Sequence, residues 1–77
     1  MVRLPVLTGY ALLKVLQRHG FLLLRQKGSH VFVESANGKC GTTIPIYRGE
    51  ELGKGLLKSI LNDLDLDTED LDIMLHS

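Results

Sequence analysis

FLLLRQKGSHVFV, residues 21–33, decides the fold of this chain. Two apolar segments that favour β structure, residues 21–24 and 31–33, flank a polar centre. That centre contains Gly28 and Ser29, and a glycine and a serine between two such segments indicate a tight turn. The stretch therefore predicts a β-hairpin.

The second strand of this hairpin is expected to run from about Ser29 to Glu34, with His30 near its start on a rigid element. Two cations, Arg25 and Lys27, come just before the turn. A rigid imidazole beside a guanidinium and an ammonium group suits phosphodiester chemistry, because the ring moves a proton while the cations hold phosphate oxygens. His30 is therefore the candidate catalytic residue, with Arg25 and Lys27 as candidate phosphate ligands. The alternative is a basic hairpin whose histidine has no chemical role.

Helical signals lie on both sides of the hairpin. Thr8 is a suitable N-cap for a helix that ends near His19, and Gly20 suits the C′ position. A second helix is predicted from about Lys54 to Leu64, because its leucines and one isoleucine repeat at helical spacing.

The remaining elements follow from turn and capping signals. Asn37-Gly38 predicts a hairpin loop, and a third strand follows from about Gly41 to Ile46. Pro45 lacks a backbone donor, so this end of the strand is expected at an edge of the sheet or already outside it. A short acidic helix closes the chain, with Asp67 or Thr68 as its cap.

The predicted order is α-β-β-β-α with a small additional helix. Consecutive strands joined by short turns form an antiparallel sheet, and both main helices should cover one face of it. The fold class is therefore α+β, a two-layer sandwich with three antiparallel strands. A chain of 77 residues is expected to form one domain spanning residues 1–77.

The charges are strongly separated along the chain although the net charge is zero. Residues 1–49 carry seven lysines and arginines and one acid, Glu34, which gives seven minus one, or +6. Residues 62–77 carry six acids and no lysine or arginine, which gives −6. This asymmetry favours an anionic partner such as RNA for the first part. The alternative is that acids and bases face each other within the fold.

Other chemistry is poorly supported. Cys40 is the single cysteine, which favours a reducing, cytoplasmic setting, and the histidines have no zinc-ligand spacing. Glu34 is the one acid before Glu50, too few for a two-metal nuclease, so no metal or cofactor is expected. No stretch approaches the length of a membrane span.

The two other histidines receive no catalytic role. His19 is expected to contact the last carbonyls of the first helix, and His76, near the terminus, receives no role.

Two further residues are candidate RNA contacts. Ser29 can donate a hydrogen bond, although turn chemistry explains a serine here equally well. Lys58 lies one helical turn from Lys54 on a common face of the second predicted helix, where it can contact phosphate.

The chain resembles the HicA toxins, small bacterial and archaeal mRNA interferases with a fold similar to double-stranded-RNA-binding domains. The resemblance lies in four segments, in order: Gly20-Phe21, residues 25–30, Ile44-Pro45 and residues 56–61. It implies that His30 is the catalytic residue, that mRNA is the substrate, and that a HicB-like antitoxin is the partner. Many relatives carry a histidine two residues after the strand proline, where this chain has Tyr47.

The resulting hypothesis is metal-independent RNA cleavage by a toxin of a toxin–antitoxin system. Two alternatives use the same basic surface. The first is an RNA-binding module without catalysis, which holds RNA by its shape and phosphates. The second is a protein-interaction domain whose cationic face binds an acidic partner.

Overall fold

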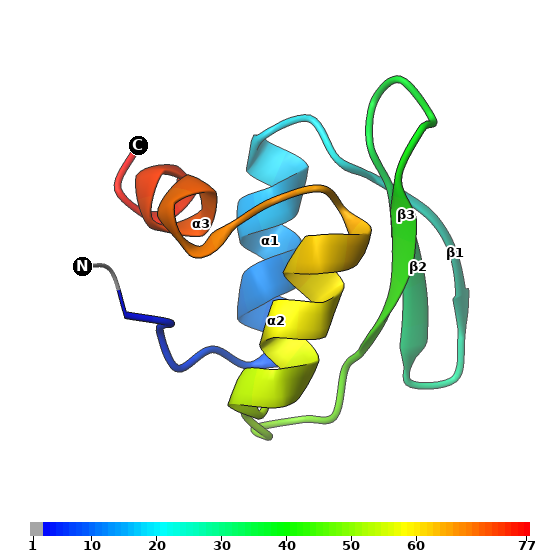
Figure 1. Cartoon of the computed structure of the whole chain (residues 1–77). Coiled ribbons are helices and arrows are strands. Elements are labelled where there is room, and N and C mark those ends of the chain that lie inside the picture. Colours follow the sequence, from blue (N-terminus) through cyan, green and yellow to red (C-terminus); the bar gives the residue numbers. More distant parts are fainter. Residues whose placement is uncertain (1–2) are drawn as a thin grey trace.

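The computed structural model describes residues 3–77, which form three helices and three strands in an α+β fold. Figure 1 shows the antiparallel sheet as one layer, with α1 and α2 packed against one of its faces. The elements in chain order are α1 (Gly9–Arg18), β1 (Leu22–Lys27), β2 (His30–Glu34), β3 (Gly41–Pro45), α2 (Lys54–Asp63) and α3 (Thr68–Leu75). This order confirms the predicted fold class. Within residues 3–77, no helix is both long enough and apolar enough to cross a membrane.

A two-residue turn joins the first two strands. Lys27 lies opposite His30, and Gly28 between them has φ 59°. A glycine with positive φ at the first central position is typical of a type II′ turn, whose twist matches that of a hairpin. The prediction of a strand over residues 21–24 is too short, since β1 continues to Lys27. The turn is so tight that the three polar residues before Gly28 also pair with β2.

The sheet has the order β1-β2-β3, so β3 is an edge strand and accommodates Pro45, as predicted. The strand ends at Pro45, one residue before the predicted Ile46. Val31 and Val33 of β2 lie opposite Ile44 and Thr42 of β3, and these four residues are buried beneath the helices. Side chains alternate along each strand, so the intervening residues point the other way. We call this second face of the sheet the open face; it carries Arg25, Lys27, His30, Phe32, Thr43 and Pro45.

Capping interactions define the ends of α1 as the sequence predicts. The Oγ1 of Thr8 accepts a hydrogen bond from the backbone N–H of Ala11 at 3.0 Å. At the other end, the N–H groups of Gly20 and Phe21 donate to carbonyls of the last turn, which is a Schellman motif.

The core forms between the helices and the sheet, and its fully buried side chains are Leu12, Leu16, Val31, Val33, Ile44, Leu57, Ile60, Leu61 and Leu71.

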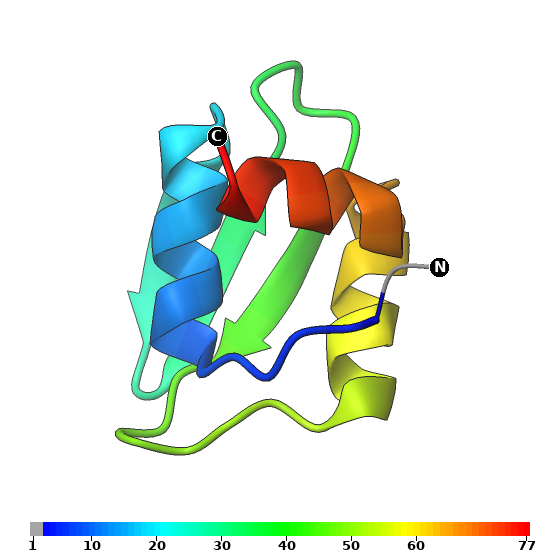
Figure 2. The ribbon, with the colours of Figure 1, turned by 90° about the vertical axis from the view of Figure 1, so that its left-hand side faces the viewer.

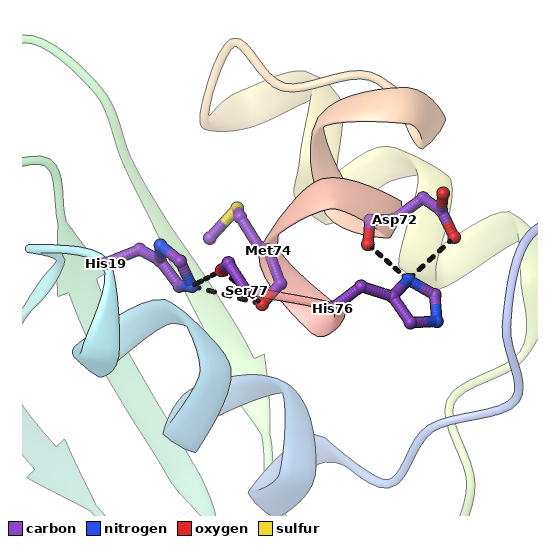
Figure 3. A network of polar contacts seen from close by, with 5 residues as sticks. All are labelled: His19, Asp72, Met74, His76 and Ser77. Atoms are coloured by element: carbon purple, nitrogen blue, oxygen red, sulfur yellow. Dashed lines mark hydrogen bonds and ion pairs between the residues drawn. The ribbon is translucent and has the colours of Figure 1, made fainter.

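The acidic helix α3 lies across α1 and α2, on the side away from the sheet (Figures 1 and 2). His19 joins it to α1, because its Nε2 donates to the carbonyl of Met74 at 3.1 Å and lies 3.0 Å from the Ser77 hydroxyl (Figure 3). The predicted contact of His19 with the end of α1 is therefore wrong: the Schellman motif already occupies those carbonyls. His76, which received no role, closes α3 with its Nδ1 2.8 Å from the carbonyl of Asp72.

Three segments meet at the lower end of the molecule in Figure 1: the start of α1, the hairpin turn and the loop after β3. Gly9 packs so closely on β3 that a Cβ atom there would overlap the carbonyl oxygen of Pro45. The N–H of Ile46 donates to the carbonyl of Ser29 at 2.6 Å and ties the loop to the turn. We call this region, residues 8–10, 27–30 and 45–49, the hairpin end.

Substitution of Gly9 should measure how much the fold depends on this close approach. We expect Gly9→Ala to lower the free energy of unfolding by about 1–3 kcal/mol, because the added methyl group must displace backbone. Chemical denaturation followed by circular dichroism gives this value.

Gly55→Ala is the matched control. No atom lies within 4 Å of a Cβ built at Gly55, in the first turn of α2, so we expect stability to rise by about 0.5–1 kcal/mol. Equal effects of the two substitutions would contradict the role assigned to Gly9.

Candidate functional site

The candidate catalytic side chain, His30, is exposed to solvent on the open face at the start of β2. Residues directly opposite each other in an antiparallel pair project from the same face of the sheet. Lys27 lies opposite His30 and Arg25 lies opposite Phe32, so both cations share the open face with the imidazole. The guanidinium carbon of Arg25 lies 5.0 Å from the centroid of the Phe32 ring, which agrees with this assignment.

The two-residue turn determines that these cations point outward, because it places Lys27 opposite His30 and strand alternation then places Arg25 on the same face. A bulge follows on the other side of Arg25. The register shifts between Leu23 and Arg25, so that Leu24 is an extra residue without a partner on β2. In a regular strand, a residue added to or removed from the register reverses the face of every side chain beyond it. Because the turn fixes the pairing of Lys27 with His30, the bulge acts on the residues before it: Leu23 faces the helices and Leu22 the open face, the reverse of what unbroken alternation would give. The bulge therefore changes the faces of the leucines and not those of the cations beside His30.

Tyr47 lies next to His30, with the two ring centroids 6.2 Å apart and the ring planes nearly perpendicular at 83°. Two backbone hydrogen bonds hold it there. Ile46 is tied to Ser29 by the 2.6 Å bond of the hairpin end, and the N–H of Glu50 donates to the carbonyl of Tyr47 at 3.0 Å. The second bond closes a tight turn, in which Gly49 adopts φ 72°. A phenol and an imidazole therefore meet at a fixed position.

The charge separation seen along the chain is also a separation in space. Among residues 3–77, the one ion pair joins His76 and Asp72, both from the acidic end, at 3.3 Å. Thus no lysine or arginine in this part of the chain is neutralised by a carboxylate. The acidic α3 lies on the far side of the helices from the sheet (Figure 1). The strand pairing places Arg25 and Lys27 on the open face. The cations around His30 are free to bind an anionic ligand.

The structure brings together four of the five predicted site residues. Arg25, Lys27, Ser29 and His30 lie on the hairpin or in its turn, and Ser29 is half-buried with its carbonyl bonded to the loop after β3. Lys58 is elsewhere: it is exposed on α2 and lines a groove with the beginning of α3. It lies in the helical layer, so the sheet separates it from the open face.

Sequence reasoning missed a pocket at the hairpin end. It has a volume of about 310 Å³ and lies between the start of α1 and the loop after β3. Its lining residues are Thr8, Tyr10, Ile46, Tyr47, Arg48 and Gly49. No signal for it was present in the sequence, since Tyr10 lies one turn before Leu13, alongside the apolar stripe of its helix. Tyr10 and Tyr47 line one pocket because Gly9 packs on Pro45, a contact that no local pattern reveals.

Metal ligands are not clustered in the described part of the chain. Among residues 3–77, no three histidine, cysteine, aspartate or glutamate side chains lie close enough together to hold one ion. Glu34 is on the open face but at the opposite end of β2 from His30. The groups that surround the imidazole are therefore cations, a phenol and backbone.

Comparison with known proteins identifies the family. Residues 9–66 match the family described as HicA toxin of bacterial toxin–antitoxin, whereas no curated protein and no solved structure matches the chain. The matched segment begins with α1 and includes the whole sheet, the hairpin with His30, and α2. It covers most of the 77 residues. The chain therefore belongs to the HicA toxin family, the toxins of bacterial toxin–antitoxin systems.

Proposed function

We propose that this protein is an mRNA-cleaving endoribonuclease that works without a metal ion and uses His30 as its acid–base group. The observation that carries the proposal is the exposed imidazole on a face where Arg25 and Lys27 have no carboxylate partner. Membership of a toxin family supports it, because these toxins are generally ribonucleases. The cellular setting we propose is the cytoplasm, where mRNA is available.

The proposed reaction uses the RNA as its own nucleophile. The 2′-oxygen attacks the adjacent phosphorus, a new 2′-O–P bond forms, and the bond from phosphorus to the 5′-oxygen breaks. His30 takes the proton of the 2′-hydroxyl or supplies one to the departing 5′-oxygen, a role worth about 10²–10⁴-fold in rate. The products are a 2′,3′-cyclic phosphate and a free 5′-hydroxyl. DNA is not a substrate, because it lacks the attacking group.

Arg25 and Lys27 supply the electrostatic part of the mechanism. Negative charge builds up on the phosphoryl oxygens in the transition state, and fixed cations beside them lower the barrier. Lys27 is the closer of the two along the strands, since it lies directly opposite His30. Arg25 stacks on Phe32, which leaves the edge of its planar guanidinium available for a two-point contact with phosphate.

Ser29 and Lys58 receive smaller roles in this proposal. The Ser29 hydroxyl contributes a hydrogen bond to the RNA backbone next to the scissile phosphate. Lys58 contacts only RNA that extends around the molecule to the helical side, because it lies on α2. Substitution of Lys58 should therefore affect binding of long RNA more than cleavage of short RNA.

A second candidate function is RNA binding without cleavage, and the neighbour of His30 favours it. Tyr47 contacts His30 where many relatives have another histidine. A phenol donates a hydrogen bond but does not exchange a proton near neutral pH as an imidazole does. The two functions differ in one observable, the integrity of RNA after incubation.

The antitoxin partner is proposed to be HicB-like and to occupy the same face as the RNA. A protein that covers the open face blocks His30 physically, and acidic side chains on it complement Arg25 and Lys27. Competition between the antitoxin and RNA follows from this shared surface.

The first test measures cleavage of single-stranded RNA by purified protein in excess chelator. We expect cutting to continue, and His30→Ala to reduce its rate by about 10²-fold or more, since the acid–base group is lost. His76→Ala is the matched control, because it removes an imidazole from the end of α3, far from the open face, and should leave the rate unchanged. Cleavage at the normal rate by His30→Ala would remove this residue from the mechanism.

The second test concerns the shared face. Lys27→Glu should weaken the binding of both RNA and antitoxin by at least about tenfold, because a like charge faces each anionic partner. Fluorescence anisotropy with labelled RNA and calorimetry with the antitoxin measure the two affinities. Lys39→Glu makes the same charge change in the loop at the other end of the sheet and should have a much smaller effect. Unchanged antitoxin affinity in Lys27→Glu would contradict the common surface.

A further inference from the structure

We infer that the pocket at the hairpin end binds one unstacked nucleobase of the RNA, next to the phosphate that is cleaved. The inference rests on the proposed RNA-cleaving function and adds to it a base-binding subsite made of Tyr10, Tyr47 and Arg48. None of these three residues takes part in the proton transfer or the phosphate contacts described above.

The chemistry of the lining favours a flat aromatic ligand. Tyr10 and Tyr47 are 57% and 47% exposed, so the pocket presents two aromatic rings to solvent. Bases of single-stranded RNA stack on such rings and on guanidinium planes, and Arg48 provides the guanidinium. The volume of about 310 Å³ lies at the lower end of the range for ligand pockets, about 300–1,000 Å³, and suits a single heterocycle better than a folded peptide segment.

The position of the pocket links it to the proposed chemistry. Tyr47 lines the pocket and also contacts His30, with ring centroids 6.2 Å apart. A base held here therefore belongs to a nucleotide beside the one whose 2′-oxygen reacts. Positive charge also lies beside the pocket, since the Nζ of Lys14 is 5.4 Å from the Tyr10 ring centroid. Lys14 can hold a phosphate that flanks the bound base.

The pocket is also held in shape by backbone contacts. Gly9 lies directly against Pro45, which fixes the start of α1 relative to the end of β3. The turn from Tyr47 to Glu50 is closed by a backbone hydrogen bond, and Gly49 has a positive φ. Because these contacts already order the loop, binding a base costs little conformational entropy, and the stacking free energy is not offset by ordering the loop.

The experiment uses wild-type protein and 2′-O-methyl tetranucleotides, which cannot be cleaved because the attacking hydroxyl is blocked. Each tetranucleotide is compared with versions that lack one base. Tyr10 and Tyr47 are the two tyrosines of the chain, which has no tryptophan, and both line the pocket, so tyrosine emission responds to a base bound there. We expect the full tetranucleotide to quench this emission, after correction for absorption by the bases, and removal of one particular base to abolish the quenching.

Substitution of Tyr10 then tests the stacking directly by calorimetry. We expect Tyr10→Leu to lower the affinity for the full tetranucleotide about 5- to 150-fold, the range expected for one base stacked on an aromatic ring. Tyr10→Phe, which keeps the ring, should bind it normally. The tetranucleotide that lacks the critical base should bind Tyr10→Leu and wild type equally. Such coupling between a ring and a base is what a double-mutant cycle detects. Tyr47→Leu is a second variant with the same expectation, and Ile73→Ala, an exposed position on α3, is the surface control.

The outcomes separate this inference from the proposed function. If neither Tyr10→Leu nor Tyr47→Leu changes the affinity, or if each weakens the full and base-lacking ligands equally, the pocket does not hold a base. Cleavage of RNA by His30 can stand in that case. If the coupling is found but unmodified RNA is never cut, the base subsite stands and the nuclease proposal fails.

Discussion

The close packing of Gly9 on the backbone of Pro45 is the contact on which the geometry of this protein depends. It sets the start of α1 against the end of β3, where the hydrogen bond between Ile46 and Ser29 also ties the loop to the hairpin turn. Three segments far apart in the sequence are thereby joined at one end of the molecule. His30 and Tyr47 face each other because of this junction.

The two-residue turn of the hairpin then decides the chemical character of the open face. It pairs Lys27 with His30, so that Lys27 and Arg25 point outward beside the imidazole. The three leucines at the start of β1 are exposed because β1 is an edge strand and the bulge at Leu24 breaks its alternation. The acidic α3 packs on the helical layer, away from this face, through its buried Leu71 and Met74, and His19 bonds to the carbonyl of Met74.

Local signals in the sequence were enough to predict most of the fold. Thr8, Gly20 and Asp67 act at helix ends as expected, because capping depends on a few neighbouring backbone groups. The hairpin was predicted correctly because a glycine with positive φ is a local requirement.

The parts that could not be predicted depend on contacts between distant segments. The bulge is decided by how β1 pairs with β2, so the sequence did not reveal which of the leucines at the start of β1 face the helices. The predicted partner of the His19 side chain was wrong because the actual partner, Met74, is 55 residues away in the sequence. Lys58 looked like part of a common basic surface, but the sheet stands between it and His30.

In the proposed reaction, an exposed imidazole among unpaired cations activates the RNA's own 2′-hydroxyl. A DNA oligonucleotide that contains a single ribonucleotide isolates this step, with the products identified by mass spectrometry. We expect one cut, on the 3′ side of the ribonucleotide, which leaves a 2′,3′-cyclic phosphate on one fragment and a 5′-hydroxyl on the other. Cuts at deoxynucleotides, or fragments that begin with a 5′-phosphate, would contradict it.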